Sequence, residues 1–309
     1  MNLKPIVLIT GATGAQGGSV ARALLKSGEY VVRIFTRNGE SEKARALELL
    51  GAEIFTGDLD DISSLKVAMQ DAYAVFGLTN YWEHEEREFQ HGKNLVDTVR
   101  ELGIWHFVFS TQANYSRLSH DQIPVPQQDI KAALETYARS QNVPVTFVRM
   151  SFYYENFLEL FPLQEDGSGL LEIGLPLGNS ALPMASVEDL GGIVTTILDH
   201  PREYLGRTVS VIAESRTGRE YADIMMRVLR RPVHYRHIPR EEFAALDFPN
   251  ANQWANLFEV QRLYIKPKKI DLIESYGLYP DLQGFESWLR KNRNKILVRK
   301  AETRKMYIY

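Results

Sequence analysis

Three glycines spaced three residues apart follow an apolar run near the N-terminus and restrict the folds open to this chain. The run Ile6 to Ile9 is typical of a strand buried on both faces. Gly11, Gly14 and Gly17 come next, and glycine permits positive φ and close approach of backbone N–H groups to a pyrophosphate. A helix that begins after such a loop points its positive N-terminal end at the same anion. The segment therefore predicts a nucleotide phosphate cradle.

The residues after the loop complete a strand–helix–strand unit. An apolar stripe at helical spacing begins at Val20, Gly28 stands where a helix ends, and Val31 to Phe35 returns as a strand. This context favours a dinucleotide-binding loop over an ordinary turn. The second strand leads into Arg37, where folds that select NAD place Asp or Glu. Because Arg forms paired N–H bonds to phosphate, the sequence favours NADP(H); the alternative is that Arg37 is a solvated loop residue.

Strands and helices continue to alternate up to about residue 150, the pattern of a doubly wound parallel sheet. The expected strands are 52–58, 74–79, 106–110 and 145–149, and the expected helices are 63–70, 83–102 and 127–141. Ligands bind outside the carboxyl ends of such strands. One rim should therefore carry Gly11 to Gly17, Arg37, Asp58, Thr79, Asn80 and Ser110.

The second half of the sequence has a different pattern, in which short expected strands lie between helices and Pro and Gly stand in the connections. The expected strands are 170–175, 208–212 and 233–238, and the expected helices are 187–199, 220–230, 240–246, 252–264 and 283–294. We therefore expect residues 1–150 to form the dinucleotide-binding domain and 151–309 a smaller α/β cap, with crossing of the chain between them left open. A cleft between the two is the expected ligand site.

Composition limits the partners and the compartment. The 309 residues carry 36 basic and 39 acidic side chains and no cysteine, which gives no general attraction to nucleic acid and excludes disulfides and thiolate chemistry. Met1 to Pro5 leads into the first strand without a signal sequence, and no apolar run is long enough for a membrane, so a cytoplasmic protein is expected. The basic tail from Lys291 to Tyr309 is interpreted as a solvated helix end.

No metal site is expected from the histidines. The run His84 to Glu88 lacks the second histidine of a zinc-binding helix, and His234 and His237 would lie on opposite faces of a strand. The neighbouring acids Asp60 and Asp61 are expected to cap the helix that starts near Ser63.

Several segments at compatible spacings resemble the NmrA-like branch of the atypical short-chain dehydrogenase/reductases. The segments are Thr10 to Arg22, Thr36 to Asn38, Gly57 to Asp61, Thr79 to Trp82, Tyr153 to Asn156 and Pro183 to Gly191. The resemblance runs nearly end to end and implies an NADP(H)-binding protein with a Rossmann-type fold.

The resemblance also implies roles for individual residues. The pyrophosphate would be held by Gly11, Ala12, Thr13, Gly14, Ala15 and Gln16, and the 2′-phosphate by Arg37. Gly17 and Asn38 are further expected cofactor-binding residues. Asp58 and Leu59 would flank the adenine, and Thr79, Asn80 and Tyr81 the ribose side. The nicotinamide would be approached by Lys131, Tyr153, Tyr154, Glu155 and Asn156. One departure is the acidic pair Glu40 and Glu42 after Arg37, where some relatives carry more cations.

Catalysis is where the chain departs from the wider superfamily. Reductases of that superfamily place a Tyr four residues before a Lys on one helix, since the ammonium then favours proton transfer from the phenol. Four residues before Lys131 stands Gln127, and a carboxamide does not deliver a proton near neutral pH. Ser110 remains as a residue that could bind a substrate's carbonyl oxygen. Tyr81, Tyr115 or Tyr153 could supply a phenol as proton donor from another direction. The alternative for Lys131 is a surface cation on an amphipathic helix.

Two functions remain open. In the first, the protein is an NADP(H) sensor with weak or no enzymatic activity that presents a cofactor-dependent surface to a regulatory protein or to a second copy of itself. In the second, it is an NADPH-dependent reductase of a quinone, an imine or an enal or other carbonyl compound bound in the cap cleft. The missing phenol at Gln127 favours the sensor.

Overall fold

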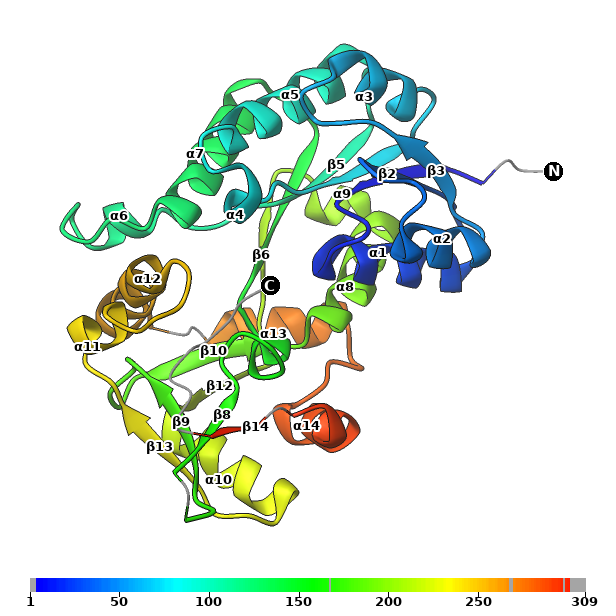
Figure 1. The fold of residues 1–309 in the computed structure, drawn as a ribbon. Helices are drawn as coiled ribbons and strands as arrows, with labels where there is room; N and C mark the ends of the chain where they lie inside the picture. The colour runs from blue at the N-terminus through cyan, green and yellow to red at the C-terminus, as the bar shows by residue number, and fades with distance from the viewer. Residues whose placement is uncertain (1–3, 167, 267–268, 297, 301–309) are drawn as a thin grey trace.

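A seven-stranded parallel sheet forms the centre of the protein in a computed structural model that describes residues 4–166, 168–266, 269–296 and 298–300. The strand order is β11-β6-β5-β4-β1-β2-β3 (Figure 1). These strands are β1 (Ile6–Thr10), β2 (Val31–Thr36), β3 (Glu53–Thr56), β4 (Ala74–Gly77), β5 (His106–Ser110), β6 (Val145–Met150) and β11 (Thr208–Val211). The predicted α/β class with a Rossmann-type doubly wound sheet is confirmed.

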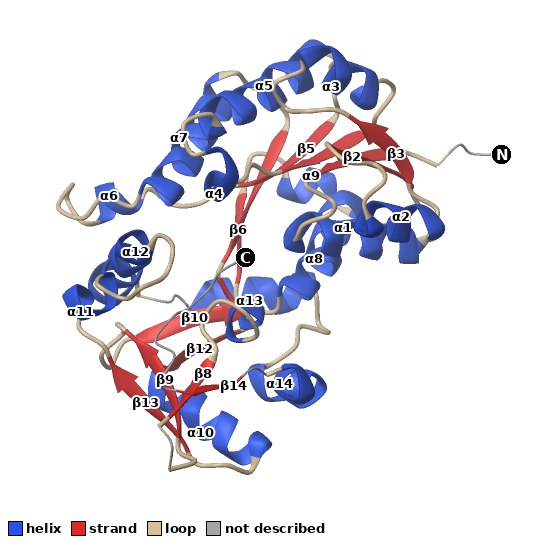
Figure 2. Cartoon of the chain, in the orientation of Figure 1, coloured by secondary structure: helices blue, strands red, loops and turns tan. Residues whose placement is uncertain are grey.

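Helices cover both faces of the sheet because alternate residues of each strand point to opposite sides. Val7 and Ile9 of β1 belong to one apolar core, and Leu8 belongs to the other. The helices of this part are α1 (Ala15–Ser27), α2 (Glu42–Leu49), α3 (Ile62–Met69), α4 (Tyr81–His84), α5 (Glu88–Glu101), α6 (Tyr115–Leu118), α7 (Pro126–Ser140), α8 (Leu190–Asp199) and α9 (Pro201–Tyr204). Figure 2 shows α3, α5 and α7 on one face and α1 and α8 on the other.

The prediction of one helix at 83–102 is wrong in one respect: the structure has two helices there, α4 and α5. The polar run Glu83 to Glu88 offers no apolar side chain that would hold a continuous helix against the sheet. The chain turns there instead, and α4 becomes a separate helix of one turn at the rim.

The second part contains two small sheets, of order β12-β10-β7 and β13-β9-β8-β14. The strands are β7 (Phe152–Tyr153), β8 (Leu163–Glu165), β9 (Leu171–Leu175), β10 (Ala181–Ala185), β12 (Glu214–Thr217), β13 (Val233–His237) and β14 (Val298–Lys300). The helices are α10 (Gly218–Leu229), α11 (Arg240–Ala244), α12 (Ala251–Tyr264), α13 (Lys269–Leu278) and α14 (Phe285–Asn292), with the 3₁₀ helices η1 (Tyr154–Phe157), η2 (Val187–Asp189) and η3 (Arg293–Lys295). Buried aromatic rings, among them Phe243, Phe258 and Trp288, fill its core.

The chain crosses back into the first part after residue 150. The strand expected at 208–212 in the cap is β11, which instead pairs with β6 at the edge of the central sheet. Helix α8 packs on α1, where a Cβ on Gly191 would lie 2.4 Å from the Ser19 carbonyl oxygen, so only glycine permits this approach. The Ser19 hydroxyl accepts the Gly191 N–H at 3.0 Å. The sheet unit therefore includes residues from the second half of the chain.

No helix within the described ranges is both long and apolar enough to cross a membrane. Residues 297 and 301–309 of the basic tail lie outside the described residues.

Candidate functional site

The glycine loop lies at the carboxyl end of β1 and leads directly into α1. Gly11 has φ +62°, and its carbonyl accepts the Gly14 N–H at 2.9 Å, which closes the turn. A Cβ on Gly17 would lie 2.4 Å from the Gly11 carbonyl oxygen, whereas the nearest atom to a Cβ on Gly14 is 3.3 Å away. Gly17 is therefore required for the packing of loop on helix, and Gly14 faces more open space.

The N-terminus of α1 differs from those of several other helices. Ser41, Asp61 and Thr217 cap α2, α3 and α10 with side-chain hydrogen bonds, whereas α1 starts at Gly14 without such a cap. Its first turn carries no acidic residue. Unsatisfied N–H groups at a helix N-terminus bind anions, so these residues fit a pyrophosphate.

Three predicted residues from separate elements form a hydrogen-bonded row beside the loop. The Ser110 hydroxyl donates to Gln16 Oε1 at 2.7 Å, and Gln16 Nε2 donates to the Tyr153 phenol oxygen at 2.7 Å. Burial raises the pKa of Tyr153 to about 12. The phenol is therefore protonated at neutral pH, and because its oxygen accepts from Gln16, its own proton remains free to donate.

Lys131 of α7 is held in a largely buried ion pair. Its ammonium contacts the carboxylate of Glu88, which is fully buried, and donates to the Thr79 carbonyl oxygen at 2.8 Å. Thr79 also donates its hydroxyl to Glu88 at 2.6 Å. Only 18% of the Lys131 side chain is exposed, so it is not a solvated surface cation. The sequence analysis did not identify Glu88, because nothing local distinguishes it from the other acids of its run.

Gln127, one turn before Lys131, packs against the second part of the protein. It is 4% exposed, and its Nε2 donates to the backbone carbonyl of Gln253 in α12 at 3.2 Å. Asn256, one turn further along α12, donates to the Pro124 carbonyl oxygen at 2.9 Å. The position that carries the proton donor in the wider superfamily is thus used here to hold α12 against α7 (Figure 1).

Helix α4 connects Arg37 to the same helix α12. Arg37 donates to Glu83 Oε2 at 2.8 Å and lies 3.0 Å from His84 Nε2. On its other side α4 carries Trp82, whose ring stacks on Trp254 with centroids 5.2 Å apart. Tyr81 is 3% exposed and donates to Glu85 at 2.5 Å; burial and this bond raise its pKa. The sequence analysis identified none of the partners Glu83, Gln253 and Trp254.

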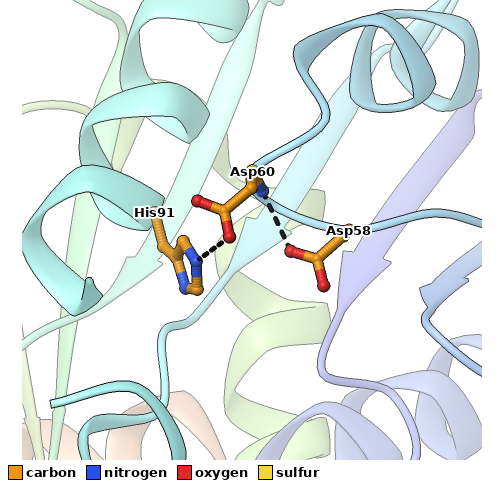
Figure 3. Close-up of side chains that lie close together, drawn as sticks. All are labelled: Asp58, Asp60 and His91. Carbon is orange, nitrogen blue, oxygen red and sulfur yellow. Dashed lines mark hydrogen bonds and ion pairs between the residues drawn. The ribbon is translucent and has the colours of Figure 1, made fainter. Parts of the chain in front are cut away.

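Asp58, Asp60 and His91 lie close together (Figure 3). Their donor atoms lie within 4.8 Å of one another, a set that no pattern in the sequence predicted. Asp60 also forms an ion pair with Arg87, so a cation of the chain already neutralises this carboxylate. His91 is 1% exposed, and burial lowers its pKa.

The expected cap of α3 is half right. Asp61 accepts the N–H groups of Ser63 at 3.0 Å and Ser64 at 3.2 Å, as predicted. Asp60 does not cap the helix, because its carboxylate turns to Arg87, the residue before α5, and to His91 in α5.

The Tyr153 to Asn156 segment divides between the rim and the core. Tyr154 is fully buried and packs on Phe285 and Trp288, with ring centroids 5.1 and 5.5 Å away. Glu155 accepts from Ser186, Val187 and Trp288 within 3.0 Å, and burial raises its pKa. The Asn156 carbonyl accepts from Phe161. The side chains of Tyr154 and Glu155 therefore anchor the second part, and Tyr153 is the residue that reaches the predicted cofactor loop.

The remaining predicted residues lie where their strands end. The Leu59 carbonyl accepts from Asn94 at 2.8 Å, and Asn80 precedes α4 as its N-terminal flanking residue. Asn38 accepts the Glu40 N–H at 3.0 Å. Arg45, a further cation near this loop, pairs with Glu40 and Glu48 rather than turning back toward Arg37.

Comparison with known proteins places the whole chain in one family. The model of the NmrA-like family matches residues 4–289. An NmrA-like family domain-containing protein of Dictyostelium discoideum is 30% identical over 246 residues, which cover 77% of this chain and 82% of that protein. An NmrA-like family domain-containing oxidoreductase of Aspergillus hancockii is 34% identical over 222 residues, 66% of each chain.

Solved structures share the fold at low sequence identity. NmrA, described as a negative transcriptional regulator, has been solved with NAD and with NADP; the NADP complex is 20% identical, with a TM-score of 0.80 and coverage of 93% of this chain and 95% of that one. The triphenylmethane reductase of Citrobacter sp., solved with NADP(H), is 21% identical, with a TM-score of 0.75 and coverage of 92% and 99%. Because the family model matches residues 4–289 of the 309, this chain belongs to the NmrA-like family.

Proposed function

We propose that this protein binds NADP(H) and acts as a regulator whose partner contacts depend on the cofactor, with little or no dehydrogenase activity. The observation that carries the proposal is Gln127, which cannot donate a catalytic proton near neutral pH and is committed to the backbone of α12. NmrA, a regulator of the same fold solved with NAD and with NADP, supports this reading.

The chain's own residues fit the cofactor. The uncapped start of α1 and the loop from Gly11 to Gln16 would hold the pyrophosphate, and Arg37 would pair with the 2′-phosphate. Lys131, already fixed by Glu88, would bind ribose hydroxyls. NADPH would supply a hydride when bound, and the residues described here would bind and orient the cofactor. The partner would be a regulatory protein or a second copy of the chain that recognises the surface around α4 and α12.

A turnover assay tests the proposal. Purified protein is first shown to bind NADPH by calorimetry and is then mixed with NADPH and a panel of quinones, imines and aldehydes. We expect no oxidation at 340 nm faster than about 1 per second, the low end of typical enzyme turnover. Faster turnover on any member of the panel contradicts the regulator and favours a reductase.

The row formed by Ser110, Gln16 and Tyr153 favours a reductase as the second candidate. Its substrate would be a quinone, an imine or an enal or other carbonyl compound, and Tyr153 would deliver the proton to the reduced oxygen or nitrogen. The relatives named oxidoreductases support this alternative.

Tyr153→Phe distinguishes this role from simple packing. If a substrate is found, we expect the substitution to lower kcat by about 10²- to 10⁴-fold, the usual contribution of a positioned acid, with the Kd of NADPH unchanged. Tyr81→Phe is the matched control, because the Tyr81 proton is already donated to Glu85. Equal losses in both variants would contradict the assignment to Tyr153.

A further inference from the structure

Helix α4 contacts the predicted 2′-phosphate site on one side and the second part of the protein on the other. Glu83 holds the Arg37 guanidinium at 2.8 Å, and His84 lies 3.0 Å from the same group. The preceding residue, Trp82, stacks on Trp254 of α12 with an interplanar angle of 19°. Because Glu83 and Trp82 are neighbours on one helical turn, a movement of the helix backbone that takes Glu83 away from Arg37 also displaces Trp82.

A 2′-phosphate and the Glu83 carboxylate would compete for the same cation. The phosphate carries about two negative charges near neutral pH, and a carboxylate left within hydrogen-bond distance of the same guanidinium would repel it. The Arg37–Glu83 pair is half exposed, 53% and 51% for the two side chains, so water offers Glu83 an alternative at small cost. A dinucleotide without the 2′-phosphate has no charge at this place to compete with Glu83.

We propose that Glu83 is a specificity-determining residue that exchanges places with the 2′-phosphate on Arg37 and thereby moves α4 away from Trp254. NADP(H) then changes the surface formed by Trp82 and Trp254, whereas NAD(H) leaves it as it is. The inference rests on the proposed function and names the signal behind it, which is the presence of the 2′-phosphate. If NADP(H) raises the affinity of a partner that prefers the displaced α4, that partner raises the affinity for NADP(H) by the same factor, because the two equilibria are linked.

The first test compares two charge-neutralising variants, Glu83→Gln and Glu86→Gln, by calorimetry with NADPH and with NADH. Glu86 is exposed and forms no ion pair with any other residue that the structure describes, so it reports the general effect of removing one charge from this turn. We expect Glu83→Gln to bind NADPH about fivefold more tightly, the scale of an exposed ion pair, with unchanged affinity for NADH. Glu86→Gln should match the wild type with both.

The second test follows the tryptophan pair. Stacked indoles give a near-UV circular dichroism signal that depends on their geometry, and Trp82→Phe identifies the part due to Trp82 and Trp254. Saturating NADP⁺ should change this signal, and saturating NAD⁺ should not. Trp105→Phe is the control, since Trp105 stacks on Tyr73 instead.

The outcomes separate the two proposals. Equal effects of Glu83→Gln and Glu86→Gln on NADPH binding, or the same change of the tryptophan signal with NADP⁺ and NAD⁺, overturn the role of Glu83 and leave the cofactor assignment intact. Failure of the wild type to bind NADPH overturns the proposed function, and the role of Glu83 with it.

Discussion

Valine in place of Gly14 is expected to abolish dinucleotide binding while leaving the fold intact. The nearest protein atom to a Cβ at this position is the Gly11 carbonyl oxygen at 3.3 Å, so the chain tolerates the side chain with a small adjustment. The backbone of Gly14 is extended, with φ −94° and ψ −178°, a region that valine adopts readily. The branched side chain would instead stand in the space predicted for the pyrophosphate at the uncapped start of α1.

The measurement pairs NADPH titration by calorimetry with far-UV circular dichroism and thermal unfolding. We expect a loss of affinity of at least about a hundredfold, roughly 2.7 kcal/mol, with a wild-type spectrum. Retained affinity would contradict the cradle.

Gly17→Ala provides the contrast to Gly14→Val. Its Cβ would lie 2.4 Å from the oxygen and 2.6 Å from the carbon of the Gly11 carbonyl, and backbone atoms cannot move aside cheaply. We expect overpacking to cost about 1–3 kcal/mol of stability and to lower the melting temperature. The two glycines therefore separate a ligand role from a folding role within one motif. A wild-type melting temperature for Gly17→Ala would contradict this division.

Arg37→Ala is expected to weaken NADPH binding by roughly tenfold to a hundredfold, about 1.5–3 kcal/mol for a charge-assisted contact. NADH binding should be nearly unchanged, because NADH has no 2′-phosphate for the guanidinium to pair with. The loss of affinity is expected to be smaller than for a buried ion pair, because the Arg37 side chain is about half exposed and already pairs with Glu83.

Arg45→Ala is the matched control for Arg37→Ala. It removes the same charge from the neighbouring helix α2, where Arg45 pairs with Glu40 and Glu48. A purely electrostatic contribution from the region would weaken NADPH binding in both variants. Equal losses of NADPH and NADH affinity in Arg37→Ala would refute the 2′-phosphate role.

Local patterns in the sequence predicted most of the first part of the fold. The apolar runs that became β1, β2 and β5 are nearly continuous, as expected for strands covered on both faces, and Gly28 ends α1 with φ 70°. These signals depend only on neighbouring residues. The same reasoning assigned the strand expected at 208–212 to the cap, because pairing of β11 with β6 joins segments some 60 residues apart and leaves no local signature.

For the candidate site, too, the sequence predicted the positions of some residues, whereas the surroundings of others became visible only in the structure. Gly11, Gly14, Gln16, Arg37 and Ser110 were expected on one rim because the carboxyl ends of parallel strands meet there. The structure places Gly11, Arg37 and Ser110 at the ends of β1, β2 and β5, and Gly14 and Gln16 at the start of α1. The resemblance implied that Tyr154 approaches the nicotinamide; its side chain is fully buried in the structure, and no local pattern reveals which residue of this segment points inward.

The sequence by itself determined the doubly wound sheet and the carboxamide at Gln127, where the wider superfamily has its proton donor, and it predicted a phosphate cradle, because these depend on residue type and spacing. Only the tertiary structure decided what those residues contact. Ion pairs and stacking contacts such as Arg37 with Glu83, Lys131 with Glu88 and Trp82 with Trp254 join residues brought together by folding. Their geometry depends on how α4, α5 and α12 pack, and no periodicity along the chain encodes that packing.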